Sequence, residues 1–225
     1  MHVIVINRNQ QKYVYQMREA LKPIEPLFVF DRCEPVLDVN FIVNNEGENF
    51  LAGKMRDYGA KDIDDDILFL DGDKVPKGNI LKDIESLKDK YDCICYGIDS
   101  DKENSVYRNF MKQDNADGIV PWQLNRSSPI AFGCYTCGMF LKKEVIEKVR
   151  LLNNGRIFHP SFDGTWGDED NFLADEVDYL GFKIGYSTHV RLSGEFSSCE
   201  TKMDMFVSNF RKRLLLNKSL LGKKI

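Results

Sequence analysis

The stretch that most constrains the fold is an apolar run that ends in two carboxylates. Residues 67–70 are Ile-Leu-Phe-Leu, and Asp71, Gly72 and Asp73 follow directly. Four consecutive apolar residues predict a strand buried on both faces. Because positions i and i+2 of an extended chain point the same way, Asp71 and Asp73 face one spot. Two carboxylates there suit Mg²⁺ or Mn²⁺ carrying phosphates; the alternative is a solvated acidic turn.

Before this stretch the chain holds a strand–helix–strand unit. Residues 2–6 and 27–30 are apolar runs, and apolar residues recur at helical spacing between them. Such a unit predicts two parallel strands. Similar patterns predict further strands at 41–43, 93–96, 139–141 and 183–186, with helices at 49–61, 78–90 and near 145–153 and 172–180. We therefore expect an α/β fold with a mixed, mostly parallel sheet flanked by helices.

The length and composition fit a cytoplasmic globular protein. A chain of 225 residues can bury a substantial core in one domain. No apolar run approaches the roughly 18 residues of a membrane span, and the start lacks the long apolar core of a signal peptide. Six cysteines occur, and we expect them to be reduced and mostly buried.

Residues 201–225 form a basic tail on an acidic body. The tail holds seven Lys and Arg residues against one Asp, whereas the whole chain has a net charge of −4. Its pattern predicts an amphipathic helix with Phe206, Phe210 and Leu214 opposite Arg211 and Arg213. Three roles are open: packing on the body with a solvated basic face, contact with an anionic membrane surface, and contact with nucleic-acid phosphates.

A second acidic cluster follows a Trp-Gly turn. Asp168, Glu169 and Asp170 come after Trp166 and Gly167, at the start of a predicted helix. The helix dipole favours carboxylates at that end, so capping explains part of the cluster. Like charges held close together raise one another's pKa, which suits a general base.

Two further side chains are candidates for phosphate or metal binding. His189 follows the strand predicted at 183–186 and is the best placed of three histidines to bind a metal. Lys54 and Arg56 lie on the helix predicted at 49–61 and can neutralise phosphates. The alternatives are a surface histidine without a ligand and a solvated helix face.

In their order along the chain, these motifs resemble the GT-A glycosyltransferases, most closely family 2. The first half has Arg-Asp-Tyr-Gly-Ala at 56–60 and the strand ending Asp-x-Asp at 67–73. In the second half, Trp-Gly-Asp-Glu-Asp at 166–170 resembles the family's Trp-Gly-Gly-Glu-Asp motif, and residues 181–184 resemble the Gly-Tyr-x-Ile strand after it. The resemblance covers about residues 2–190.

The resemblance implies a nucleotide-sugar site in the first half. Asp31 would contact the nucleobase, usually uracil, and Arg56 would lie near the nucleotide. Asp71 would meet the ribose or the metal, and Asp73 would bind Mn²⁺ or Mg²⁺ on the diphosphate of a UDP-sugar. His189 would be the third metal ligand, although the family's C-terminal histidine would fall near Ser193 by spacing.

The resemblance also implies an acceptor site in the second half. Asp170 would be the base that deprotonates the acceptor hydroxyl, Glu169 would bind the acceptor, and transfer would proceed with inversion. The chain would be a hexosyltransferase-like enzyme with a nucleotide-sugar-binding half (1–98), an acceptor half (99–200) and the tail (201–225). Its acceptor would be a glycan, a lipid-linked molecule at a membrane surface or a modified DNA base. Two residues depart from the family pattern: Asp57 replaces Asn and Asp168 replaces Gly.

Two alternatives remain. The Asp-x-Asp-x-Val pattern at 71–75 also fits haloacid dehalogenase-like phosphatases, with Asp71 as nucleophile and Asp73 as general acid. Against this, the strands predicted at 2–6 and 27–30 precede the motif, which normally ends the first strand in that family. The second alternative is a degenerate GT-A domain that only binds.

Overall fold

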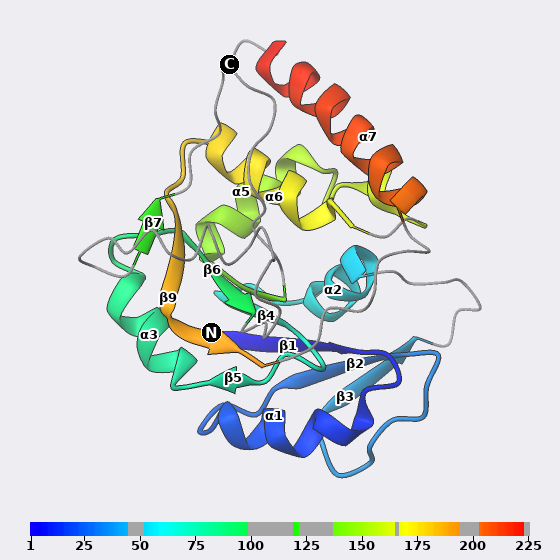
Figure 1. Cartoon of the computed structure of the whole chain (residues 1–225), viewed down its shortest axis with the longest axis vertical. Helices are drawn as coiled ribbons and strands as arrows, with labels where there is room; N and C mark the ends of the chain where they lie inside the picture. The colour runs from blue at the N-terminus through cyan, green and yellow to red at the C-terminus, as the bar shows by residue number, and fades with distance from the viewer. Residues whose placement is uncertain (45–51, 99–118, 122–136, 165–166, 194–202, 223–225) are drawn as a thin grey trace.

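The computed structural model describes residues 1–44, 52–98, 119–121, 137–164, 167–193 and 203–222. Within these residues nine strands form one mixed sheet in the order β3-β2-β1-β4-β8-β6-β9-β5, with β7 paired to β9 (Figure 1). Helices cover both faces of this sheet. The predicted α/β fold is confirmed.

The sheet has a parallel side and a mixed side. The parallel side consists of β1 (His2–Asn7), β2 (Leu27–Asp31), β3 (Phe41–Asn44) and β4 (Ile67–Asp71). On the mixed side, β8 (Gly138–Leu141) is antiparallel to β4 and to β6 (Cys93–Ile98), and β9 (Ile184–Leu192) is parallel to β6. The short strands β5 (Pro76–Lys77) and β7 (Ile119–Pro121) are antiparallel to β9.

Alternate residues of the central strands enter two separate cores. Ile4 and Phe69 belong to the core under α2 (Ala52–Ala60), α5 (Lys143–Leu152) and α6 (Glu169–Tyr179). Val5 and Leu68 belong to the core under α1 (Val14–Ala20) and α3 (Ile80–Leu87). Because both faces are covered, these strands are continuous apolar runs in the sequence. The described residues also form two 3-10 helices, η1 (Gln11–Tyr13) and η2 (Pro160–Phe162).

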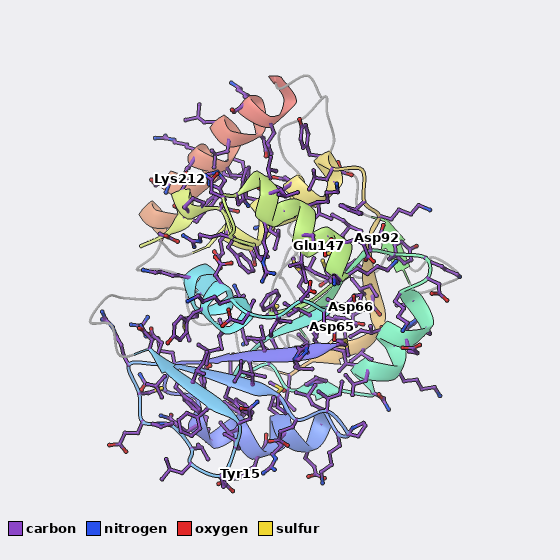
Figure 2. The ribbon with its side chains drawn as sticks, turned by 180° about the vertical axis from the view of Figure 1, so that it is seen from behind. Tyr15, Asp65, Asp66, Asp92, Glu147 and Lys212 are labelled. Atoms are coloured by element: carbon purple, nitrogen blue, oxygen red, sulfur yellow. The ribbon has the colours of Figure 1, made fainter. Side chains whose placement is uncertain are left out.

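The acidic run before β4 lies at the amino-terminal edge of the parallel strands. Asp66 Oδ1 accepts a hydrogen bond from Lys143 N (2.9 Å) at the start of α5, and Asp65 Oδ2 lies 2.6 Å from the terminal amine. Asp92 Oδ1 pairs with Lys142 Nζ at 2.8 Å. Figure 2 shows Asp65, Asp66 and Asp92 on this side of the molecule. These carboxylates therefore join β4, α5 and β6 at the edge of the sheet where the parallel strands begin.

The last helix, α7 (Met203–Gly222), packs along α6 (Figure 1). Leu220 joins Phe162 and Phe172 in a small third core. Arg213 is only 3% exposed, and its Nε donates to Asp175 Oδ2 on α6 (2.6 Å). Of the three interpretations of the tail, packing on the body placed Arg213 on a solvated face, and that part is wrong because Arg213 pairs with the buried carboxylate of Asp175 on α6. Of the three roles considered for the tail, the structure shows packing on the body, through α7.

Two findings bear on the predicted location of the protein. None of the described helices is long and apolar enough to cross a membrane. Cys33, Cys93 and Cys137 carry free thiols, whereas Cys95 is disulfide-bonded. The expectation of reduced cysteines is therefore wrong for Cys95.

Candidate active site

The candidate site lies where β1, β2 and β4 end. These strands are parallel, so their carboxyl ends meet at one edge of the sheet, which is where open α/β sheets bind ligands. Asn7 ends β1, Asp31 ends β2 and Asp71 ends β4. The register sets Asp71 beside Ile6, so the three polar side chains leave the sheet at neighbouring positions.

Asp31 and Asn7 are buried, and each has one polar atom without a hydrogen-bond partner among the described residues. Asp31 is 0% exposed, and its Oδ1 accepts a hydrogen bond from Asn44 Nδ2 (2.8 Å). Its Oδ2 lies 3.9 Å from Arg8 Nε and accepts no hydrogen bond from the described residues. Asn7 Nδ2 is likewise a buried donor without a hydrogen-bond acceptor among them. Since buried polar groups are normally hydrogen-bonded, these two atoms suit a polar ligand.

Gly72 lets the turn after β4 lie against β1. Its backbone N donates to Ile6 O at 2.8 Å. A Cβ at this position would lie 2.8 Å from Ile6 O and 2.8 Å from Gln10 Oε1, closer than real Cβ atoms come. Only glycine fits between the two carboxylates without moving the backbone of β1.

Arg56 joins the two acidic clusters predicted from the sequence. It lies on α2, is 2% exposed and stacks 5.5 Å from the Phe158 ring centroid. Its Nη2 donates to Asp71 Oδ1 at 2.7 Å, and its Nη1 donates to Glu169 Oε1 at 3.2 Å. The strand that carries Asp71 and the helix that carries Glu169 therefore meet at one guanidinium.

The charges at this junction shift one another's titration. Burial raises the pKa of Asp71 above its ordinary value, and Arg56 opposes that rise. Burial, and then the charge of Asp170, raise the pKa of Glu169 to about 7, again opposed by Arg56. For Arg56, burial lowers the pKa, but Asp71 and Glu169 outweigh it and the pKa is raised. Arg56 therefore stays charged, while Glu169 titrates near neutral pH.

The carboxylates of Asp71 and Asp73 are partly exposed, so a cation can reach them. Their side chains are 29% and 24% exposed. Asp73 Oδ2 pairs with Lys74 Nζ at 2.6 Å. No group of three or more His, Cys, Asp or Glu side chains in the described residues is arranged to hold a metal. Because Mg²⁺ and Mn²⁺ at phosphate sites need only one or two carboxylates beside phosphates and water, the pair still fits such an ion.

The second acidic cluster lies in the first turn of α6. Asp168 precedes the helix in the left-handed conformation (φ 67°). Glu169 and Asp170 follow and are buried, at 7% and 8% exposed. Asp170 Oδ1 accepts a hydrogen bond from Asn171 N at 2.8 Å, and Glu169 Oε2 accepts none from the described residues. The turn thus sets the Glu169 carboxylate against Arg56, and the charge of Asp170 is near enough to raise the pKa of Arg56.

His189 lies apart from these contacts. The last strand continues to Leu192, so His189 lies within β9 and not after a strand ending at 186. Its Nδ1 lies 2.8 Å from Asp83 Oδ1 on α3, and the side chain is 46% exposed. Tyr96 and Ser187 also donate to Asp83. No described contact joins His189 to Asp71 or Asp73, and its role as a metal ligand stays a prediction.

Sequence reasoning missed the supports behind these residues. Asp57 Oδ1 accepts hydrogen bonds from Ile157 N (2.8 Å) and Phe158 N (3.2 Å), and Asp57 Oδ2 accepts one from Arg156 Nε (2.9 Å). These bonds hold Phe158 against Arg56. The departure of Asp57 from the family's Asn was the available signal, but the loop it holds is about 100 residues away in the sequence.

Comparisons with known proteins identify the fold. No protein-family model and no curated protein matches the sequence. Solved structures match closely in three dimensions. TarS 1–349 from S. aureus, in complex with UDP-GlcNAc, has a TM-score of 0.69 at 15% identity, over 100% of this chain and 68% of TarS 1–349.

Two other glycosyltransferases agree with this match. The mannosyltransferase PcManGT from Pyrobaculum calidifontis, in complex with GDP-Man and Mn²⁺, has a TM-score of 0.60 at 14% identity, over 99% of this chain and 64% of its own. GalNAc-T7, with UDP, GalNAc and Mn²⁺, has a TM-score of 0.61 at 12% identity, over 95% and 47%. The chain therefore has the GT-A fold, as its sequence motifs predicted.

Proposed function

We propose that this chain is a metal-dependent glycosyltransferase that moves a sugar from a UDP-sugar to an acceptor hydroxyl with inversion. One observation carries the proposal: Arg56 joins Asp71, at the carboxyl edge of the sheet, to Glu169 at the start of α6. A donor phosphate site and a base can thus share one small region. The GT-A neighbours in complex with UDP-GlcNAc, or with GDP-Man and Mn²⁺, support this assignment.

The nucleobase would lie at the ends of β1 and β2. Asp31 Oδ2 offers a buried acceptor and Asn7 Nδ2 a buried donor, both without hydrogen bonds to the described residues. Uracil presents an N–H donor between two carbonyl acceptors, so its edge can satisfy both atoms. Asn44 fixes the Asp31 carboxylate through Oδ1 and leaves Oδ2 for the base.

Asp71 and Asp73 would hold Mn²⁺ or Mg²⁺ with the donor diphosphate. When bound, the ion supplies Lewis-acid stabilisation of the leaving diphosphate. His189 is the proposed third ligand. Its Nδ1 faces Asp83 Oδ1, which is the usual second partner of a metal-binding histidine and leaves Nε2 for a cation.

Asp170 would act as the base and Glu169 would bind the acceptor. The acceptor oxygen forms a bond to the anomeric carbon as the bond from that carbon to the diphosphate breaks. The bonding electron pair leaves with the diphosphate, and the hydroxyl proton passes to Asp170. Attack opposite the leaving group inverts the anomeric carbon. Arg56 would hold Glu169 in place and balance the negative charge of the region.

The test measures thermal stabilisation and donor hydrolysis across UDP-, GDP-, CDP- and TDP-sugars, with and without Mn²⁺. The variant Asp73→Ala is compared with Asp62→Ala, which changes an exposed carboxylate. We expect Mn²⁺-dependent stabilisation by UDP-sugars in wild type and Asp62→Ala, and its loss in Asp73→Ala. Mg²⁺-dependent phosphate release from a phosphomonoester, without any nucleotide response, would instead support the phosphatase. Nucleotide binding without turnover with any donor would support a domain that only binds.

A further inference from the structure

The last helix, α7, contacts the turn that precedes the proposed catalytic residues. Gly167 and Asp168, which precede Glu169 and Asp170, both contact α7. Asn209 Nδ2 donates to Gly167 O at 3.1 Å, and Arg213 Nη1 lies 3.6 Å from Asp168 Oδ1. Residues 209 and 213 are one helical turn apart, so the same face of α7 makes both contacts.

This face is a buried polar stripe. Asn209, Arg213 and Asn217 recur every four residues and are 1%, 3% and 4% exposed. Arg213 Nε and Nη2 donate to the two oxygens of Asp175 at 2.6 and 2.9 Å, and Asn217 Nδ2 donates to Asp175 Oδ2 at 2.7 Å. The bidentate pair fixes the guanidinium rigidly on α6. Arg213 is thereby held in place to meet Asp168.

Asp168 is an unusual residue for its backbone conformation. Its φ of 67° lies in the left-handed region, where glycine costs least and aspartate is tolerated. Asp168 is also 2% exposed, and its Oδ1 accepts a hydrogen bond from Asn171 Nδ2 at 2.9 Å. A buried carboxylate in this conformation requires compensation, and Arg213 is the cation that lies beside it.

We propose that α7 is a positioning element of the active site. Through Arg213 on Asp168 and Asn209 on Gly167, it fixes the turn that directs Glu169 and Asp170 toward Arg56. Arg213 is then a positioning residue, since its guanidinium pairs with Asp168 and Asp175, on either side of Glu169 and Asp170 in the sequence. This inference rests on the proposed function for its effect on turnover, but the contact with the turn exists independently of it.

The test uses the full chain with two variants and one matched control. Arg213→Met removes the guanidinium. Asp168→Asn removes only one charge, since Asn tolerates the left-handed conformation, keeps an Oδ1 acceptor for Asn171 and leaves the Arg213–Asp175 pair intact. Arg211→Met makes the same change at an exposed position of α7. Binding is measured with UDP and Mn²⁺, and turnover by hydrolysis of UDP-N-acetylglucosamine and UDP-glucose.

We expect Arg213→Met to lower kcat about tenfold, because a small displacement of a base is costly. The KM and the UDP affinity should change less than about twofold, since the substitution leaves Asp31, Asp71 and Asp73, the proposed nucleotide and metal ligands, unchanged. Asp168→Asn should lower kcat by about threefold. The double variant should be no slower than Arg213→Met alone, because both changes break one interaction. Equal kcat values for Asp168→Asn, Arg213→Met and Arg211→Met would overturn the proposal.

Hydrogen exchange separates this inference from the proposed function. Amides 168–172 should exchange faster in Arg213→Met and Asp168→Asn than in Arg211→Met, with the sheet strands unchanged. If Arg213→Met does not fold, Asp168→Asn decides the question. If wild type neither binds UDP nor hydrolyses a donor, the proposed function fails, and faster exchange at 168–172 still supports the positioning role. Unchanged exchange there would contradict it.

Discussion

Arg56 and Glu169 are 113 positions apart in the sequence, yet Arg56 Nη1 donates to Glu169 Oε1 at 3.2 Å in the interior of the protein. Arg56 Nη2 also donates to Asp71 Oδ1. One buried cation thus compensates carboxylates from both halves of the chain. The cost of burying it is offset only while those partners stay charged and in place.

Removing this cation should destabilise the fold strongly. Arg56→Met leaves Asp71 and Glu169 buried without their counterion, and we expect the free energy of unfolding to fall by about 3 to 5 kcal/mol at pH 8. Urea unfolding measures the change, with Lys61→Met at an exposed position as the control. The loss should be smaller at pH 5, where Glu169 is protonated. A loss below about 1 kcal/mol at pH 8 would show that the cation is not needed.

Glu169 should make stability depend on pH between its two pKa values. Its pKa is about 7 in the folded chain against an ordinary value of 4.5. The folded state therefore holds a proton that the unfolded state has lost, and wild type loses stability as the pH rises from about 4.5 to about 7. Glu169→Gln lacks this loss. Its stability relative to wild type should rise by up to roughly 3 kcal/mol across this window and stay level above it.

Unfolding free energies of wild type and Glu169→Gln at intervals from pH 4 to pH 9 measure this difference. Glu176→Gln serves as a comparison, since Glu176 also lies buried on α6 but accepts a hydrogen bond from the neutral side chain of Asn153 (3.0 Å). A constant difference between wild type and Glu169→Gln across the whole range would contradict the raised pKa of Glu169.

The parts of the fold that could be predicted are those that depend on residues close together in the sequence. The strand at 67–70 is buried on both faces, and its apolar run showed that directly. The carboxylates at 71 and at 169–170 could be found because each follows a recognisable element. Their meeting through Arg56 could not be derived from spacing, since it depends on how α2 and α6 pack on the same face of the sheet.

Side-chain direction on a helix was less predictable. One of the three interpretations of the tail left Arg213 in solvent, where basic residues usually lie. The recurrence of polar residues at 209, 213 and 217 was visible in the sequence, but the same spacing describes a solvated face. Only the position of Asp175 on α6 shows that this stripe is buried. The place of His189 was not predicted either: it lies within β9, and its Nδ1 lies 2.8 Å from Asp83 Oδ1 on α3.

Asp57 should matter for its oxygen acceptors more than for its charge. Burial raises the pKa of Asp57, and Arg156 opposes that rise. Arg156 also pairs with Asp163 and keeps a counterion without Asp57. Asp57→Asn keeps an oxygen acceptor for Ile157 N and Phe158 N and loses only the hydrogen bond from Arg156 Nε, so it should cost about 1 kcal/mol. Asp57→Ala removes all three hydrogen bonds and should cost about 2 to 3 kcal/mol. Chemical unfolding of both variants measures this, and equal losses would contradict it.

Asp31 should control nucleobase affinity through its Oδ2. This atom is a buried acceptor that makes no hydrogen bond to the described residues, while Oδ1 is occupied by Asn44. In Asp31→Asn, the amide either presents a donor to the N–H of uracil or gives up the bond from Asn44. We expect the affinity for UDP with Mn²⁺ to fall about tenfold to a hundredfold, the effect of losing a hydrogen bond to a charged group.

Calorimetric titration of UDP into wild type, Asp31→Asn and the exposed control Asp62→Asn measures this effect. The fold should survive, because the substitution keeps the size of the side chain and removes a buried charge. Asn44→Ala should weaken UDP binding less than Asp31→Asn, because it frees the carboxylate to move without removing the acceptor. UDP affinities within about twofold for all of these proteins would place the nucleobase away from the ends of β1 and β2.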